Sequence, residues 1–193
     1  GEDDGNGSFV LGLMSLHEGK QSECDKYLKM SISKDNVDAM ILQSSLLIKK
    51  NPTESMSLLK RAIEKGSLIA MYGYASFIAK GEFGPIKNGK DKEAFLFMKK
   101  AADGGIRDAI VEIADWYLTG FGCVRNVENS LLYYKKAADS LNDPFSQFSF
   151  GSLSLCIENS DKKVAVDYLK KSDHNNFPDA SFKLGFCFLN GKG

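Results

Sequence analysis

Small, large apolar and polar residues follow one another in a pattern that recurs along the chain. Two stretches show it most plainly, KEAFLFMKKAADGG at 92–105 and NSLLYYKKAADS at 129–140, with matching positions 36 residues apart. In each stretch, a small residue is followed four positions later by a large apolar residue and seven positions later by another small one. Spacings of four and seven place all three on one face of a helix. Both stretches are therefore predicted to be helices with the same buried face.

The same spacing occurs in five predicted helices, which we call the second helices. The first small position is occupied by Cys24, Ser55, Ala94, Ser130 and Ala165. The large apolar position, four residues later, holds Leu28, Leu59, Met98, Tyr134 and Leu169, and the second small position holds Ser31, Ala62, Ala101, Ala137 and Ser172. Small residues let a neighbouring helix approach closely, and the large residue fills the groove between the two.

A first helix with its own pattern precedes each of these. It starts at a small residue, in turn Gly7, Ala39, Ala70, Ala109, Ser146 and Ala180. Five residues later the residue is again small: Gly12, Ser44, Ala75, Ala114, Gly151 and Gly185. Seven residues after the start it is apolar: Met14, Leu46, Phe77, Trp116, Leu153 and Cys187. Because this last column is apolar in every copy, Trp116 is expected in the core rather than at a binding site.

Successive starts lie 32, 31, 39, 37 and 34 residues apart, and such periods with two helices per copy are typical of a solenoid. Stacked copies bury a continuous core that an isolated helix pair cannot form. We therefore predict an all-α, right-handed superhelical α-solenoid of antiparallel helix pairs. A flexible leader is expected at 1–6 and a single array at 7–193. The predicted repeats are 7–38, 39–69, 70–108, 109–145, 146–179 and the partial 180–193.

The predicted helix ends carry suitable residues. Asp38, Asp108 and Asp179 each precede a small residue that starts a first helix, where a carboxylate can cap free N–H groups and complement the helix dipole. Pro144 and Pro178 suit positions before or within a first turn. Basic pairs such as Lys99-Lys100 and Lys170-Lys171 come late in the second helices, where the dipole favours positive charge. A phosphate-binding ladder is the alternative interpretation of these lysines.

The composition of the chain argues against nucleic-acid binding, membrane insertion and a metal or cofactor site. The chain has 193 residues with 25 basic and 25 acidic side chains, and a neutral balance argues against nonspecific nucleic-acid binding. No apolar run approaches the roughly 18–20 residues of a membrane span, so we expect no membrane insertion by this segment. The four cysteines form no CxxC pair and the two histidines are far apart in sequence, so neither a metal nor a cofactor site is predicted.

The paired pattern resembles the Sel-1-like repeat, small-x3-L-[GA]-x2-[YF]-x2-G followed by a loop and A-x6-[AS]. The third copy matches it with Ala70, Tyr74, Ala75, Ile78 and Gly81 before Ala94, Ala101 and Ala102. The fourth copy matches it with Ala109, Ile113, Ala114, Tyr117 and Gly120 before Ser130, Ala137 and Ala138. The first, second and fifth copies depart from the pattern, for instance at Gln43. Tetratricopeptide repeats are the structural alternative, but their regular 34-residue period fits the variable loops less well.

The resemblance implies a non-enzymatic scaffold or adaptor that presents a concave groove to a protein or peptide partner. An alternative is a regulatory or targeting arm of a larger enzyme or of an endoplasmic-reticulum quality-control complex. Relatives in a cysteine-rich bacterial branch are linked to β-lactam hydrolysis or binding, but this chain lacks their cysteine pair in each repeat. The cytoplasm is preferred and the endoplasmic-reticulum lumen stays open. The partner's identity and the oligomeric state are not predicted.

The candidate partner-binding residues lie three, six and ten positions after the start of a first helix. First helices usually line the concave surface of such arrays. The six candidates are Lys80, Glu112, Asp115, Thr119, Lys183 and Asn190. The alternative for each is a plain solvated position. No set of acid, base and nucleophile is visible, so no catalytic residue is predicted.

Overall fold

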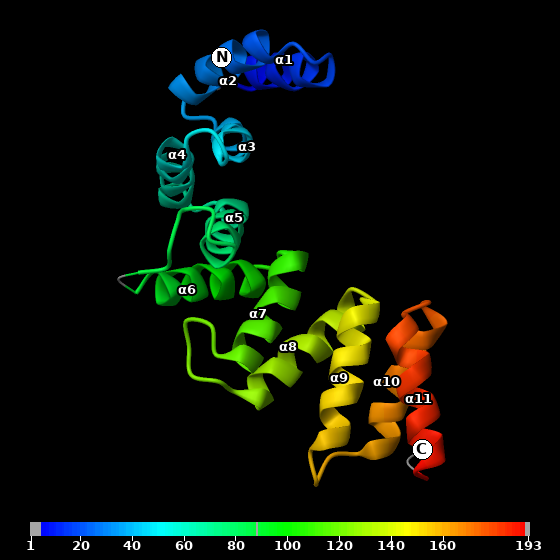
Figure 1. The fold of residues 1–193 in the computed structure, drawn as a ribbon. Helices are drawn as coiled ribbons and strands as arrows, with labels where there is room; N and C mark the ends of the chain where they lie inside the picture. Colours follow the sequence, from blue (N-terminus) through cyan, green and yellow to red (C-terminus); the bar gives the residue numbers. More distant parts are fainter. Residues whose placement is uncertain (1–4, 88, 192–193) are drawn as a thin grey trace. The chain divides into compact units, whose positions relative to one another are not determined.

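The computed structural model describes residues 5–87 and 89–191, which form helices and contain no strand (Figure 1). The helices are α1 (Asn6–His17), α2 (Gln21–Ser33), α3 (Val37–Leu47), α4 (Pro52–Glu64), α5 (Leu68–Ala79), α6 (Lys90–Asp103), α7 (Arg107–Thr119), α8 (Val127–Ser140), α9 (Pro144–Cys156), α10 (Lys162–His174) and α11 (Pro178–Leu189). The predicted all-α repeat of helix pairs is confirmed. The chain divides into two compact units, Gly1–Ala101 and Ala102–Gly193.

Within each unit, helices that follow one another along the chain lie against one another. In the first unit α1 packs on α2, α2 on α3, α3 on α4 and α4 on α5. In the second unit the same holds from α7 through α11. First helices of successive repeats also touch, α3 against α5 and α9 against α11. Helices α2, α3 and α4 in the first unit and α8, α9 and α10 in the second are therefore each covered by both neighbours in sequence, as in a stacked repeat.

The three columns predicted for the second helices form the core. Each of their members, in α2, α4, α6, α8 and α10, is at most 1% exposed. Three of the four serines in these columns donate to backbone carbonyls: Ser31 Oγ to Gly5 at 2.9 Å, Ser55 Oγ to Ser44 at 2.9 Å and Ser172 Oγ to Pro144 at 2.7 Å. The buried hydroxyl of the fourth, Ser130, has no such acceptor within the described residues. A small side chain allows close approach here, and its hydroxyl ties the second helix to a first helix.

Most residues in the three columns predicted for the first helices are buried, but some copies differ. The starting residues are fully buried except Gly7, which is exposed. The small residues five positions later are buried except Gly185 on α11. The apolar column at the seventh position is less uniform: Trp116 and Cys187 are buried, as predicted for Trp116, whereas Met14 is 54% exposed. Trp116 also packs its ring 4.5 Å from that of Phe121.

The predicted aspartate caps are wrong in position. Asp38, Asp108 and Asp179 lie inside the first turns of α3, α7 and α11, so they complement the dipole, but they are not the capping residues. The cap of α3 is Asn36, whose side chain accepts from Ala39 N at 2.9 Å, and Ile106 and Phe177 hold the other two cap positions without a side-chain bond. The helices begin at Val37, Arg107 and Pro178, so each aspartate occupies the second helical position rather than the cap. Pro144 and Pro178 do stand in first turns, as predicted.

The end of the predicted leader is held by polar contacts. Residues 1–4 lie outside the described residues, but Gly5 is buried and its carbonyl accepts from Ser31 Oγ. Asn6, the first residue of α1, accepts a hydrogen bond at its side-chain oxygen from Asn36 Nδ2 at 2.8 Å. The loop before α3 is thereby tied to the start of α1.

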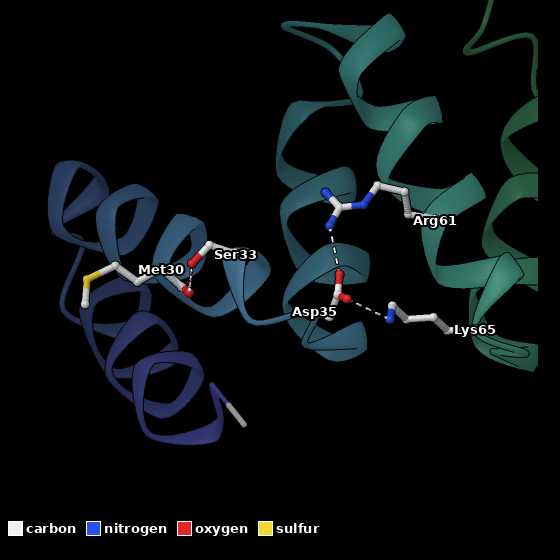
Figure 2. A network of polar contacts seen from close by, with 5 residues as sticks. All are labelled: Met30, Ser33, Asp35, Arg61 and Lys65. Atoms are coloured by element: carbon white, nitrogen blue, oxygen red, sulfur yellow. Dashed lines mark hydrogen bonds and ion pairs between the residues drawn. The ribbon is translucent and has the colours of Figure 1, made fainter. Parts of the chain in front are cut away.

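Polar links join successive second helices, and they differ in kind between the two units. In the first unit Asp35, in the loop after α2, accepts from Arg61 on α4 at 3.1 Å and from Lys65, directly after α4, at 3.0 Å. Ser33 Oγ donates to the Met30 carbonyl at 2.7 Å (Figure 2). Hydrogen bonds from Lys65 and Arg61 lower the pKa of Asp35, although all these groups are exposed. Exposed pairs of this kind add little stability.

In the second unit, hydrogen bonds from buried tyrosines, rather than ion pairs, link successive second helices. Tyr133 OH donates to Asp103 at 2.6 Å, and Tyr168 OH donates to Asp139. Both tyrosines occupy the same position of their second helix, and both aspartates lie near the end of the previous one. The link therefore recurs with the repeat, and the aromatic rings add buried apolar area to it.

Candidate partner-binding surface

The six candidate residues are spread over three first helices and both units. Lys80 is the exposed C-cap residue of α5 in the first unit. In the second unit Glu112, Asp115 and Thr119 are on α7, while Lys183 and Asn190 are on or directly after α11. Thr119 and Asn190 donate to carbonyls one turn earlier in their own helices, Asp115 at 2.9 Å and Phe186 at 2.7 Å. The structure thus gives each candidate its own surroundings, and their joint role in binding stays a prediction.

Asp115 is part of a buried polar junction between first helices. Its half-buried carboxylate accepts from the hydroxyl of Tyr134 on α8, and Ser149 of α9 hydrogen-bonds to the same hydroxyl. Burial raises the pKa of Asp115, and the bond from Tyr134 opposes this only in part. Burial and the Asp115 carboxylate together raise the pKa of Tyr134, so the phenol stays a donor. Asp115, six residues after the start of its repeat, and Ser149, three residues after the start of the next repeat, therefore both hydrogen-bond to Tyr134 of the second helix between them.

Lys183 lines a pocket between α9 and α11. The pocket has a volume of about 140 Å³, and its lining is Leu155, Cys156, Lys183, Phe186 and Cys187. The wall is apolar apart from the single ammonium of Lys183 and the two thiols, both unbridged. Cys156 is exposed, and its thiol donates to the Ser152 carbonyl at 3.5 Å. A cavity this small lies well below the roughly 300–1,000 Å³ of sites for small molecules and cofactors, so one side chain of a partner suits it better.

The paired lysines of the second helices are largely engaged in structural contacts. Lys170 and Lys171 line a more open pocket of about 340 Å³ together with Asn142, His174 and Asn175. Lys170 lies 3.7 Å from Asp167, and Lys171 lies over the Tyr168 ring at 4.6 Å from its centre. Because nearby carboxylates and aromatic faces already balance these charges, the structure favours a structural role over a phosphate ladder.

The described part of the chain contains no group of three or more histidine, cysteine or acidic side chains placed to hold a metal ion. Within the same residues, no helix combines the length and the apolar character needed to cross a membrane.

Phe186 and Leu155, which form the apolar wall beside Lys183, were not among the predicted site residues. A signal for Phe186 was present in the repeat. The sixth position after the start holds Leu13, Ser45, Ser76, Asp115, Ser152 and Phe186. Phe186 is the aromatic member of a column that is polar in four of its six copies, and an exposed aromatic is a common feature of binding surfaces.

Comparison with known proteins agrees with the repeat pattern. A sequence model described as the Sel1 repeat matches residues 39–67, 68–106, 107–140 and 178–193. A search of curated proteins gave no match. Among solved structures, the chain is similar to a Sel1 repeat protein from Oxalobacter formigenes, with 21% identity, a TM-score of 0.74, and coverage of 97% of this chain and 80% of that one.

Two further solved structures share the fold. A protective antigen present in uropathogenic Escherichia coli strains, which displays an SLR fold, matches with 22% identity and a TM-score of 0.75 over 96% of this chain. The chain spans 41% of the length of that antigen. The MamA protein matches with 16% identity and a TM-score of 0.60, over 94% of this chain and 97% of that one. At these identities the likeness establishes the fold alone.

Proposed function

Because the chain belongs to the Sel1 repeat family, whose members are generally non-catalytic modules of protein–protein interaction, we propose that it is a non-enzymatic scaffold for a protein or peptide partner. The partner lies along the exposed side of the first helices. In the second unit its anchor point is the pocket between α9 and α11.

The composition of this pocket is the observation that carries the proposal. Its small volume, apolar wall and single positive charge match one large apolar side chain with a carboxylate close by. Apolar anchors inserted into pockets supply most of the affinity of typical interfaces, and a nearby charge fixes orientation and partner choice. We therefore propose a peptide segment in which a large apolar residue is adjacent to an aspartate or glutamate.

Selection from a library of displayed random peptides tests this proposal directly. Peptides selected on the wild-type protein are expected to share an apolar residue beside an acidic one. Lys183→Glu should weaken their binding about tenfold or more, since it replaces attraction by repulsion at the pocket. Lys170→Glu is the matched control, because Lys170 is a second-helix lysine whose side chain is 55% exposed and lies outside the pocket between α9 and α11.

Lys183 is a sharper probe than Asp115. Charge reversal at Asp115 also removes the acceptor of Tyr134, so a loss of binding there mixes a folding defect with a lost contact. Selected peptides that bind the Lys183→Glu variant as well as they bind wild type would refute the proposed pocket. Equal losses with Lys170→Glu would show that only general charge matters.

A further inference from the structure

Two of the four cysteines line the same pocket between α9 and α11. Cys156 is the last residue of α9, and Cys187 lies near the end of α11. The cavity has a volume of only about 140 Å³, and neither thiol is in a disulfide. Leu155, next to Cys156 in the sequence, packs against the buried cluster that contains Cys187. The two cysteines are therefore neighbours in the fold, although they lie 31 positions apart in the sequence.

Neighbouring first helices of this unit meet with a shift of three positions in the repeat. Asp115, six residues after the start of its repeat, and Ser149, three residues after the start of the next, share the hydroxyl of Tyr134. Cys156 comes ten residues after the start of its repeat, and Cys187 comes seven residues after the start of the next, which is the same shift. The repeat geometry therefore places the two cysteines opposite each other where α9 and α11 meet.

The two thiols differ in their access to solvent. The tenth position after the start of a repeat is exposed in all six copies, which hold His17, Lys49, Lys80, Thr119, Cys156 and Asn190. Because internal copies share this exposure, it is a property of the repeat and does not depend on where α9 lies in the chain. Cys187, by contrast, is only 1% exposed. A small reagent in solution therefore reaches Cys156 first.

The other two cysteines are poorer reactants. Cys24 is fully buried, and Cys123 is half-buried with its thiol donating to the Trp116 carbonyl at 3.6 Å. Burial raises the pKa of both thiols, so less of each is present as the thiolate that attacks a disulfide. Beside Cys156, the ammonium group of Lys183 lines the cavity. Reactive cysteines typically have such exposed, electropositive surroundings.

We propose that Cys156 and Cys187 are a reversible redox pair, in which Cys156 exchanges with a small disulfide that carries carboxylates and Cys187 completes an internal disulfide. In the first step the Cys156 thiolate attacks one sulfur of the small disulfide, which forms a mixed disulfide and releases one small thiolate. In the second step the Cys187 thiolate attacks Cys156 Sγ, and the other small thiolate leaves. Two protein thiols are oxidised by two electrons, and one small disulfide is reduced to two thiols that take up the two protons.

The fold allows this bond with a small movement. Helices α9 and α11 bring Cα atoms within 8 Å of each other, and a disulfide needs Cα atoms about 4.4–6.8 Å apart. Cys156 ends α9 and the chain turns to an extended conformation at Ile157, so the backbone at Cys156 can shift while the interior of the helix stays intact. The bond joins two successive repeats through the wall of the pocket. It requires no partner, so the redox pair and the proposed peptide binding are separate properties.

The test exposes the full chain to oxidised glutathione, a small disulfide with carboxylates, at about pH 8, near the ordinary pKa of a thiol. Remaining thiols are then blocked, and the products are mapped as peptides by mass spectrometry. Wild type is expected to show Cys156 linked to Cys187, and dithiothreitol should reverse the link. The link should form about tenfold faster or more than any glutathione adduct at Cys123, whose thiol is less accessible.

Variants separate the two steps. Cys187→Ser should retain one glutathione on Cys156, because no thiol is left to displace it. Cys156→Ser, a change at an exposed residue, should leave Cys187 as a free thiol, because the buried sulfur is out of reach. Lys183→Glu should slow the first step about threefold or more, since it repels the carboxylates of glutathione, whereas Lys170→Glu outside this cavity should react like wild type. Circular dichroism checks that each variant keeps its helix content.

Three outcomes would overturn the proposal. The first is that wild type retains glutathione on Cys156 as firmly as Cys187→Ser does, because Cys187 would then be unable to displace it. The second is a bond from Cys156 to a second copy of the chain, seen as a dimer on a non-reducing gel in place of the internal link. The third is that Cys156 stays free, or that Cys24 or Cys123 reacts before it. None of these measurements involves a peptide, so their failure is distinct from a failure of the proposed function.

Discussion

Helices α9 and α11 are the first helices of successive repeats, but the glycine at the fifth position is buried in α9 and exposed in α11. Each begins with a proline in its first turn and carries a buried small residue at its start and a glycine five positions later. Gly151 of α9 is buried against α10, with no room for a Cβ, whereas Gly185 of α11 is exposed with open space around it. The same residue is thus a close contact in one copy and a surface position in the other.

The comparison shows that a small residue at the fifth position of a first helix is suited to a helix–helix contact, but does not by itself make that position buried. A glycine at the fifth position makes close approach possible, but a second helix has to be present for the contact to form. Within the described residues Gly185 lacks the contact that Gly151 makes.

The largest effect is expected on the α10 side chain that lies on Gly151. Leu169 is fully buried, so Leu169→Ala removes apolar area and leaves a cavity, at a cost of about 2–5 kcal/mol in the free energy of unfolding. Leu189→Ala is the matched change on α11, where the leucine is 88% exposed, and should stay within about 0.5 kcal/mol of wild type. Urea unfolding followed by circular dichroism measures both. Similar losses for the two variants would mean that α11 is covered in solution.

A smaller effect, opposite in sign between the two copies, is expected at the glycines themselves. Gly151→Ala forces a methyl group against the Ala165 carbonyl and should destabilise by about 1–2 kcal/mol after the gain in helix propensity is deducted. Gly185→Ala has only that gain and should stabilise by up to about 1 kcal/mol. Thermal and urea unfolding of the two variants give the comparison. A stabilising Gly151→Ala would show that α9 and α10 can separate at no cost.

The sequence predicted the helix-pair repeat and its core because these depend on local spacing. Leu59 and Met98 are buried because helices of the same and the adjacent repeats pack around their helices. The regular repeat period is enough to predict that such helices are present. The prediction for Trp116 succeeded for the same reason. Helix starts were placed less well, since Asn36 rather than Asp38 caps α3, and two polar residues close together carry the same local signal.

The candidate surface was less predictable than the core. The columns identified Lys183, but its pocket depends on Leu155 of the neighbouring helix, a contact that no spacing within one repeat reveals. Asp115 was selected as a solvent-facing position, yet the tyrosine of the same repeat reaches it. Exposure at such positions depends on the length of the side chains opposite, and those vary from copy to copy.

On its other side, α9 is joined to α7 by the polar junction of Asp115, Tyr134 and Ser149, which has no counterpart between α9 and α11 in the described residues. Tyr134 joins α9 to α7 through Ser149 and Asp115, whereas the same column between α9 and α11 holds Leu169, which has no hydroxyl to share. Asp115→Ala leaves Tyr134 with only Ser149, so a loss of about 1 kcal/mol is expected. The corresponding change at the α9–α11 junction, Ser152→Ala, removes no bond to a tyrosine and should cost less.

Asp115→Asn separates the hydrogen bond from the charge. The asparagine oxygen still accepts from Tyr134, but no buried negative charge remains. Since burial raises the pKa of Asp115 in the folded chain, its contribution to stability is fully present below the unfolded pKa and is lost as the pH rises through the folded pKa. At neutral pH the Asn variant should therefore unfold at equal or higher urea concentration than wild type, and its advantage should vanish as the pH falls below the ordinary range of aspartate. An advantage that grew on acidification would mean that the Asp115 carboxylate, rather than its protonated form, stabilises the junction.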